Sequence, residues 1–218
     1  YTGEDTLSLH DALPIFKIEK KGKIIYENKL ETLRKYLTIL IKNKKSNTVL
    51  IIDHGLGGGA SHYIDESLES KIKEKKMVIL MRYDFNITKD YNINFFSDKF
   101  SYKFSSKNIS YIFTELSKFK INEIFINSLV SYPNVYNIIE SIIALKKQTQ
   151  AKVILPIHDF SPLCPSYTLL NEKMEYCGIP QDFKICENCL KNNKNEFKIF
   201  EKEEIGRASC RERVSSPV

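Results

Sequence analysis

The residues with the clearest chemical potential are the glycines of the stretch DHGLGGGASHY. Gly57, Gly58 and Gly59 lack Cβ atoms, so the backbone can turn sharply there and approach a ligand closely. The amides that open the following helical pattern, at Ala60 and Ser61, would favour an anion, above all a phosphate. A tight turn without a ligand is the alternative, but three successive glycines exceed what a turn requires. The spacing therefore indicates a ligand-binding turn.

A second group of reactive side chains stands in ILPIHDFSPLCPSY, where His158 and Asp159 follow an apolar run. A histidine at such a position can hold a sugar hydroxyl or accept a proton near neutral pH. An adjacent His-Asp pair is also a common structural hydrogen-bonding pair. Both groups follow predicted buried strands, and ligands of open α/β sheets bind outside the carboxyl ends of the strands. We therefore expect the glycines and His158 to face one crevice.

Four cysteines follow this pair with the spacing C-x12-C-x8-C-x2-C, at Cys164, Cys177, Cys186 and Cys189. A Cys-x-x-Cys pair closed by two further thiolates fits a tetrahedral structural zinc site. Such an ion would order a loop that has no obvious core of its own. Free thiols in a reducing cytosol and two disulfides in an exported protein are the alternatives. A redox-active pair is disfavoured because the motif does not open a helix after a thioredoxin-like strand.

The elements that must position these residues follow from the hydrophobic pattern. Short apolar runs typical of strands buried on both faces cover residues 48–53, 77–83, 122–127 and 151–157. Helical patterns separate them, at residues 60–76, 109–120 and 133–147. Residues 85–105 alternate apolar and polar side chains, which predicts a strand pair. The alternation predicts an α/β domain over residues 47–160, with a Rossmann-like, mostly parallel sheet and flanking helices.

The two ends of the chain differ from the Lys-, Asn- and Ile-rich sequence between them. Residues 6–15 can be encoded by ACT CTT TCC CTA CAC GAC GCT CTT CCG ATC, and the reverse complement of this DNA, read one base along, encodes residues 205–214. Residues 1–15 and 204–218 therefore resemble a translated sequencing adapter and are set aside from the fold. The sequence then predicts a gene fragment with a lead-in helix region at 16–46, whose helix spans 29–45, the α/β domain, and a Cys-rich loop at 161–203 that begins a missing remainder.

The charge of the chain limits its partners. Between the adapter-like ends there are 30 Lys and Arg residues and 22 Asp and Glu residues. The basic residues are scattered, which is typical of a solvated surface and is a weaker indication of peripheral association with an anionic membrane. There is no basic stripe or known module for nucleic acid, and no run approaches the ~20 apolar residues of a membrane span. We expect a cytoplasmic protein, with any membrane contact on the inner face.

The glycine stretch also permits a dinucleotide-binding interpretation. Gly55, Gly57 and Ala60 match G-x-G-x-x-A, and Asp84 follows the second predicted strand, where a dinucleotide fold holds its ribose-binding acid. The polar dipeptide before Gly55 stands where that fingerprint usually stays apolar. An NAD(P)-dependent oxidoreductase domain is therefore an alternative, and a zinc-stapled interaction module is another.

The combination of IIDHGLGGGASHYIDE with ILPIHDFSPLCPSYTLLNEKMEYCGIP and ICENCL resembles the amino-terminal half of a family 4 retaining glycosyltransferase with the GT-B architecture. A subset of bacterial polysaccharide enzymes in that family has a strand that ends in His-Asp, a Cys-Pro loop, a YCG and a Cys-x-x-Cys. The resemblance covers residues 47–190.

This resemblance implies transfer of a sugar from a nucleotide-sugar donor to a glycan or lipid-linked acceptor in surface polysaccharide synthesis. It implies that residues 57–59 line an interdomain cleft near the donor diphosphate and the acceptor. His158 would lie near the transferred sugar, and Asp159 would help to hold the turn. No catalytic metal or cofactor is expected, because backbone amides, helix dipoles and basic side chains stabilise the departing nucleotide diphosphate. The donor pocket is expected in a carboxyl-terminal domain, so the chain alone is expected to be inactive.

Overall fold

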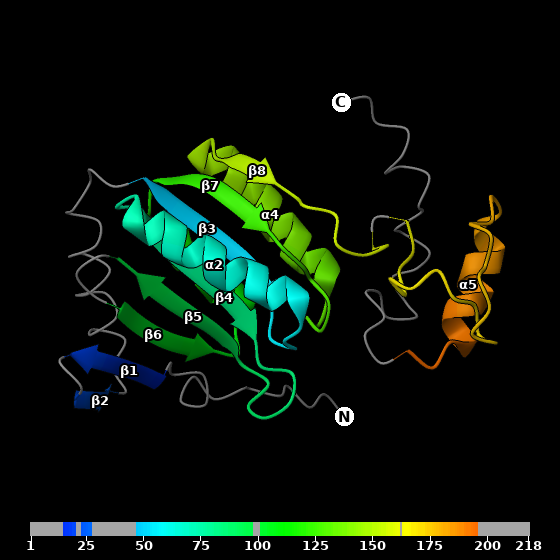
Figure 1. Ribbon diagram of the computed structural model, residues 1–218, viewed down its shortest axis with the longest axis horizontal. Coiled ribbons are helices and arrows are strands. Elements are labelled where there is room, and N and C mark those ends of the chain that lie inside the picture. The colour runs from blue at the N-terminus through cyan, green and yellow to red at the C-terminus, as the bar shows by residue number, and fades with distance from the viewer. Residues whose placement is uncertain (1–14, 21–22, 28–46, 98–100, 162, 196–218) are drawn as a thin grey trace, which may run out of the picture.

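The computed structural model describes residues 15–20, 23–27, 47–97, 101–161 and 163–195 (Figure 1). The helix predicted at residues 29–45 lies outside these ranges. The adapter-like ends also lie outside them, apart from Ile15.

One mixed β-sheet forms the centre of the fold. In the described residues its strands are β1 (Ile15–Lys20), β2 (Lys23–Glu27), β3 (Thr48–His54), β4 (Met77–Tyr83), β5 (Tyr91–Phe96), β6 (Ser101–Ser106), β7 (Ile121–Ile126) and β8 (Lys152–Ile154). They lie in the order β2-β1-β6-β5-β4-β3-β7-β8. The neighbours β4, β3, β7 and β8 are parallel to one another. The pairs β4–β5, β5–β6, β6–β1 and β1–β2 are antiparallel.

Helices flank this sheet, so the α/β class predicted from the sequence is confirmed. Among β3 to β8 the parallel pairings predominate, and the strand pair expected within residues 85–105 is β5 and β6. The sequence did not predict β1 and β2, which lie largely in the region assigned to a lead-in helix. β1 begins at Ile15, inside the segment that resembles an adapter, and pairs with β6.

β3 illustrates why the central strands are apolar throughout. Successive side chains of a strand point to opposite faces of the sheet. Leu50 and Ile52 belong to the hydrophobic cluster on one face, and Val49 and Ile51 belong to the cluster on the other. All four side chains are at most 1% exposed. Because both faces are covered, the strand shows no polar alternation.

The helices cover the two faces of the sheet. α2 (Gly59–Lys73) packs on one face through Ile64, and it lies in front of β3 and β4 in Figure 1. α3 (Ile109–Leu116) and α4 (Val135–Thr149) pack on the opposite face, where their buried apolar residues are Ile112, Phe113, Leu116, Val135, Ile138, Ile142 and Leu145. A partly buried ion pair ties the last turns of α2 to β7, because Lys71 Nζ lies 3.0 Å from Glu123 Oε1.

The connections that follow β3 and β7 leave the sheet on opposite faces. β3 leads into α2 and then to β4, whereas β7 leads into α4 and then to β8. β3 and β7 are parallel neighbours. The carboxyl ends of these two strands therefore flank a topological switch point, the place where ligands bind in open α/β sheets.

β8 is shorter than the strand predicted at residues 151–157, because it ends at Ile154. Pro156 has no backbone N–H to donate to a neighbouring strand. The apolar residues on either side of it, Leu155 and Ile157, are exposed. His158 consequently follows the strand by four residues instead of directly.

Beyond β8 the chain leaves the sheet and forms α5 (Phe183–Asn192), which was not predicted (Figure 1). Asp182 caps this helix by accepting a hydrogen bond from Lys184 N at 3.0 Å. Cys186 and Cys189 lie on α5, but the pair does not open the helix, which begins at Phe183. Between β8 and α5, the described residues contain an isolated bridge from Leu170 to Tyr176 and no strand of the thioredoxin kind.

Candidate functional site

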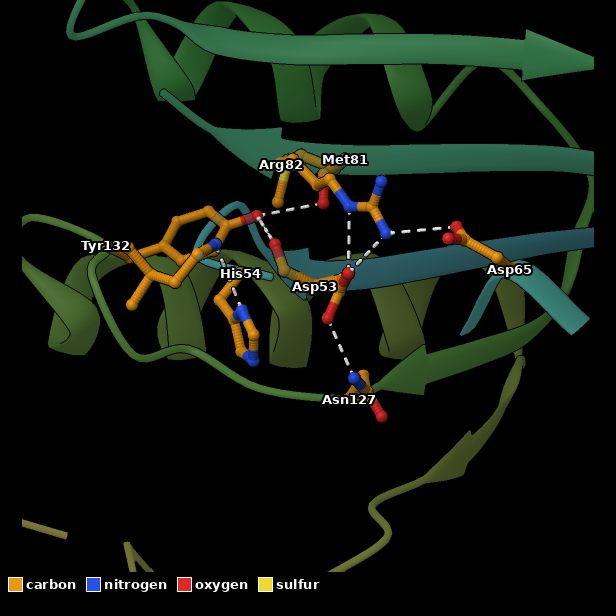
Figure 2. A network of polar contacts seen from close by, with 8 residues as sticks. Asp53, His54, Asp65, Met81, Arg82, Asn127 and Tyr132 are labelled. Carbon is orange, nitrogen blue, oxygen red and sulfur yellow. Dashed lines mark hydrogen bonds and ion pairs between the residues drawn. The ribbon is translucent and has the colours of Figure 1, made fainter. Parts of the chain in front are cut away.

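Asp53, at the carboxyl end of β3, organises this edge of the sheet (Figure 2). Its side chain is fully buried, with 0% exposure. Arg82 stands opposite it on β4 and places Nε 2.8 Å and Nη2 2.7 Å from Asp53 Oδ2. Asn127, directly after β7, donates from Nδ2 to Asp53 Oδ1 at 2.7 Å. One carboxylate thus joins the ends of three adjacent parallel strands.

Arg82 extends this network to the helix that follows the glycines. Its Nη2 lies 3.5 Å from Oδ1 of Asp65 on α2, whose side chain is 61% exposed. Buried ion pairs persist where additional hydrogen bonds satisfy the charged groups, and exposed pairs contribute little. Asp53 meets the first condition, because each of its oxygens receives a donor. The contact with buried Asp53 therefore fixes Arg82, whereas the contact with exposed Asp65 guides α2 only weakly.

Tyr132 closes the same network from the loop between β7 and α4. Its hydroxyl lies 2.9 Å from the backbone carbonyl oxygen of Asp53 and 2.9 Å from that of Met81 (Figure 2). A phenol has one proton, which these two acceptors share. The contacts fasten the β7–α4 loop to the ends of β3 and β4.

Three tyrosine rings pack together beside this hydroxyl. The centroids of Tyr83 and Tyr91 are 5.1 Å apart, and those of Tyr83 and Tyr132 are 6.0 Å apart. Burial raises the pKa of Tyr91 to about 12. Burial also raises the pKa of Tyr83 and holds that of Tyr132 well above 10.0, with Asp53 adding to the effect at Tyr132. The cluster is a neutral, apolar support beneath the polar edge.

The glycine turn lies at the exposed end of β3, between this network and α2. Gly57 and Gly58 have φ values of 81° and 87°, in the left-handed half of conformational space that other residues rarely adopt. A Cβ atom on Gly55 would lie 3.0 Å from the backbone oxygen of Tyr83. Gly59 has neither constraint, because a Cβ atom there would meet nothing within 4 Å. The fold explains the other glycines of the turn and leaves Gly59 without a structural reason.

The predicted anion-binding amides are partly used by the helix itself. α2 begins at Gly59, and Ala60 lies in its first turn. The Ser61 amide donates to Gly58 O at 3.1 Å, so it is not available in the way the sequence suggested. The first turn of α2 has no acidic residue, and no side chain caps it. The positive end of the helix dipole therefore keeps its attraction for anions.

His158 approaches the same helix from the segment after β8. Its ring packs edge-on against Tyr63 of α2, with centroids 5.6 Å apart and an interplanar angle of 61°. Tyr63 in turn lies 6.2 Å from the ring of Phe125 on β7. His158 is exposed, and Tyr63 is 47% exposed. The structure thus brings His158 beside the helix that the glycine turn opens.

Asp159 has a structural partner, because its Oδ1 accepts a hydrogen bond from Ser161 N at 2.7 Å. This contact bends the chain directly after His158. Among the described contacts, the Asp159 carboxylate thus has a partner in its own turn and none in His158.

Several members of the site were not identified as functional residues from the sequence. Arg82, Asn127 and Tyr132 converge on Asp53 from separate elements. His54 also belongs to this edge, and its Nδ1 accepts a hydrogen bond from Leu56 N at 3.2 Å (Figure 2). For Arg82, Asn127 and His54 the available signal was a polar residue at or just after the end of an apolar strand. Tyr132 lies further along the loop after β7 and carried no such signal.

Asp84, the acid required by the dinucleotide interpretation, is committed to its own turn. Its carboxylate accepts hydrogen bonds from Ile87 N at 3.0 Å, from Thr88 N at 3.3 Å and from Thr88 Oγ1 at 3.1 Å. The bond from Ile87 N is the main reason that the pKa of Asp84 lies below its ordinary value. A ribose at this position would compete with three local donors.

The four predicted zinc ligands, Cys164, Cys177, Cys186 and Cys189, are half-buried. Within the described ranges, no three His, Cys, Asp or Glu side chains already stand in a metal-binding arrangement.

Comparison of the chain with protein-family models, with curated protein sequences and with solved structures gave no match. None of the helices in the described part of the chain has the length and apolar character needed to cross a membrane.

Asp53→Asn is expected to lower the free energy of unfolding by about 3 kcal/mol, because Arg82 loses its buried ionic partner. The new amide also turns a donor toward either Arg82 or Asn127. Asp65→Asn is the matched control and should cost less than about 1 kcal/mol, since Asp65 is exposed. Urea unfolding of the 218-residue chain, followed by circular dichroism, measures both values. Equal destabilisation by the two variants would contradict the central role of Asp53.

Tyr91→Phe is expected to reduce the loss of stability at alkaline pH. The pKa of folded Tyr91 is raised from 10.0 to about 12, so the neutral phenol favours folding. Its contribution is fully present below about pH 10 and is lost as the pH rises toward about 12. Denaturant unfolding at a series of pH values should give a steeper fall for the unaltered chain than for Tyr91→Phe. Parallel curves would show that Tyr91 titrates normally.

Proposed function

We propose that the described α/β domain is the amino-terminal half of a retaining GT-B glycosyltransferase. The enzyme would transfer a sugar from a nucleotide-sugar donor to a glycan or lipid-linked acceptor in bacterial surface polysaccharide synthesis. The observation that carries the proposal is the packing of His158 against Tyr63 of α2, the helix that the glycine turn opens at the switch point. This arrangement supports a polar ligand with an anionic group at the carboxyl edge of the sheet.

In this proposal the glycine turn and the start of α2 face the diphosphate. Gly59 lets the backbone approach the ligand, and the uncompensated end of α2 attracts negative charge. Stabilisation of a departing nucleotide diphosphate is the largest electrostatic demand of sugar transfer. Fixed backbone dipoles meet that demand without reorganising.

His158 is the group proposed to contact the transferred sugar. The edge-on contact with Tyr63 orients the imidazole, and the Asp159 turn fixes the backbone beside it. An exposed imidazole held in this way can bind a hydroxyl or take up a proton. The proposed role needs no metal ion, and it leaves Asp159 as a positioning residue.

The dinucleotide alternative is less well supported, because Asp84 is engaged by Ile87 and Thr88. In addition, β4 is followed by the antiparallel β5 and not by another βα unit. Binding of NAD to the 218-residue chain, with no response to nucleotide sugars in the full-length protein, would favour the alternative over sugar transfer.

His158→Ala is expected to reduce sugar transfer about a hundredfold or more in the full-length protein expressed from the uninterrupted gene. Its melting temperature should remain unchanged, because the His158 side chain is exposed. His62→Ala is a matched control on the exposed surface of α2 and should retain activity. Transfer is measured with a panel of nucleotide sugars and isolated glycan acceptors. Full activity of His158→Ala would remove His158 from the mechanism.

Gly59→Ala separates a structural glycine from a ligand-facing one. In the 218-residue chain, Gly58→Ala should lose about 1–3 kcal/mol of stability because of its positive φ. Gly59→Ala should lose none and could gain up to about 1 kcal/mol. In the full-length protein, Gly59→Ala should nevertheless lower transfer about tenfold or more, because its methyl group displaces the ligand. Retained transfer would mean that Gly59 does not line the ligand site.

A further inference from the structure

The segment of residues 160–195, here called the cysteine segment, has little apolar core. Its buried large hydrophobic side chains among the described residues are Leu169 and Leu190. Met174 and Tyr176 are 71% and 66% exposed. So small a core rarely holds a segment without a disulfide or a metal ion.

Polar contacts nevertheless bring the end of α5 onto the loop before it. Asn193, which is buried, donates from Nδ2 to Leu170 O at 3.1 Å. Asn195 donates from Nδ2 to Ser166 O at 2.8 Å. These contacts join residues more than twenty positions apart, so the cysteine segment is a folded unit with residues 166–170 at its centre.

Three of the four cysteines surround that centre. Cys164 Sγ lies 3.1 Å from Ser166 Oγ, and Cys177 N donates to Leu169 O at 3.0 Å. Cys189 Sγ lies 4.0 Å from Leu170 O. Cys186 is three residues before Cys189 on α5, so these two side chains share one face of the helix. The thiols of Cys164 and Cys189 thus lie at this centre, the backbone of Cys177 joins it, and Cys186 is one helical turn away.

We propose that the cysteine segment binds one structural Zn²⁺ ion through its four cysteines, Cys164, Cys177, Cys186 and Cys189. Four thiolates complete the tetrahedral shell that structural zinc prefers, and the Cys-x-x-Cys pair supplies two of them from one turn. The ion replaces the weak contact from Cys189 to Leu170 with strong metal–sulfur bonds. This inference does not depend on the proposed sugar transfer.

A carboxylate close to the thiols suits a cation at this place. Glu172, Cys164 and Cys177 lie close enough to Cys189 to interact with it electrostatically. A Zn²⁺ ion would be attracted by Glu172 and would displace the protons of the four thiols.

Binding must also order the segment, because the thiols are not yet assembled as a metal-binding group in the described structure. The four side chains have to turn toward a common centre. Zinc binding and folding are commonly coupled in this way. Removal of the ion should consequently loosen residues 160–195 and leave the sheet intact.

The test is metal analysis of the 218-residue chain, expressed with zinc in the medium and purified in the presence of a reducing agent. We expect about one zinc ion per chain. Cys177→Ser should lower the bound zinc at least about tenfold. Cys210→Ser is the matched control, because Cys210 lies outside the four-cysteine set, and it should keep the zinc.

Two further measurements keep the test decisive where Cys177→Ser does not fold. Cobalt substitution of the unaltered chain should give the thiolate-to-metal absorption bands of a tetrahedral four-sulfur site. A thiol reagent should react with Cys164, Cys177, Cys186 and Cys189 only after a strong chelator is added. A zinc-free chain in which these four thiols react at once would overturn the proposal. Two disulfides, found by mass spectrometry without reduction, would also overturn it.

Discussion

The buried carboxylate of Asp53 is the constraint on which the carboxyl edge of the sheet depends. A charge removed from water must be paired and hydrogen-bonded, and the chain meets this demand with Arg82 from β4 and Asn127 from the end of β7. Because these residues lie at the ends of neighbouring strands, pairing the Asp53 charge also favours the observed register of β3 with β4 and β7. The glycine turn begins two residues after Asp53, so its starting point is fixed by the same charge. The network thereby fixes the position of the glycine turn at this edge of the sheet.

The central strands and the helices that cover them could be predicted because burial produces a local hydrophobic pattern in the sequence. A strand covered on both faces must be apolar at every position, as β3 and β4 are. The contacts of Asp53 produce no such local pattern, because Arg82 and Asn127 are 29 and 74 residues away from it in the sequence. β8 was predicted too long because Leu155 and Ile157 have the composition of a buried strand although they are exposed. α5 was missed because its helical face carries cysteines instead of a run of large aliphatic side chains.

The two parts of the chain are held by different physical means. The sheet and its helices bury continuous apolar surface, with clusters on both faces. The cysteine segment depends on amide side chains that reach backbone carbonyl groups and on polar side chains with few apolar neighbours. Apolar burial is non-directional, whereas a hydrogen bond is lost when its donor moves by about an ångström. The position of His158, which lies between these two parts, therefore depends on both.

The two ion pairs of α2 have a mechanical consequence. Asp65, in its first half, faces Arg82 on β4, and Lys71, near its end, binds Glu123 on β7. The helix is thus anchored to β7 near its end, and near its start it is guided only weakly by the exposed pair with Arg82. A displacement of the start of α2 would therefore be resisted first at the far end of the helix, where Lys71 joins Glu123 of β7.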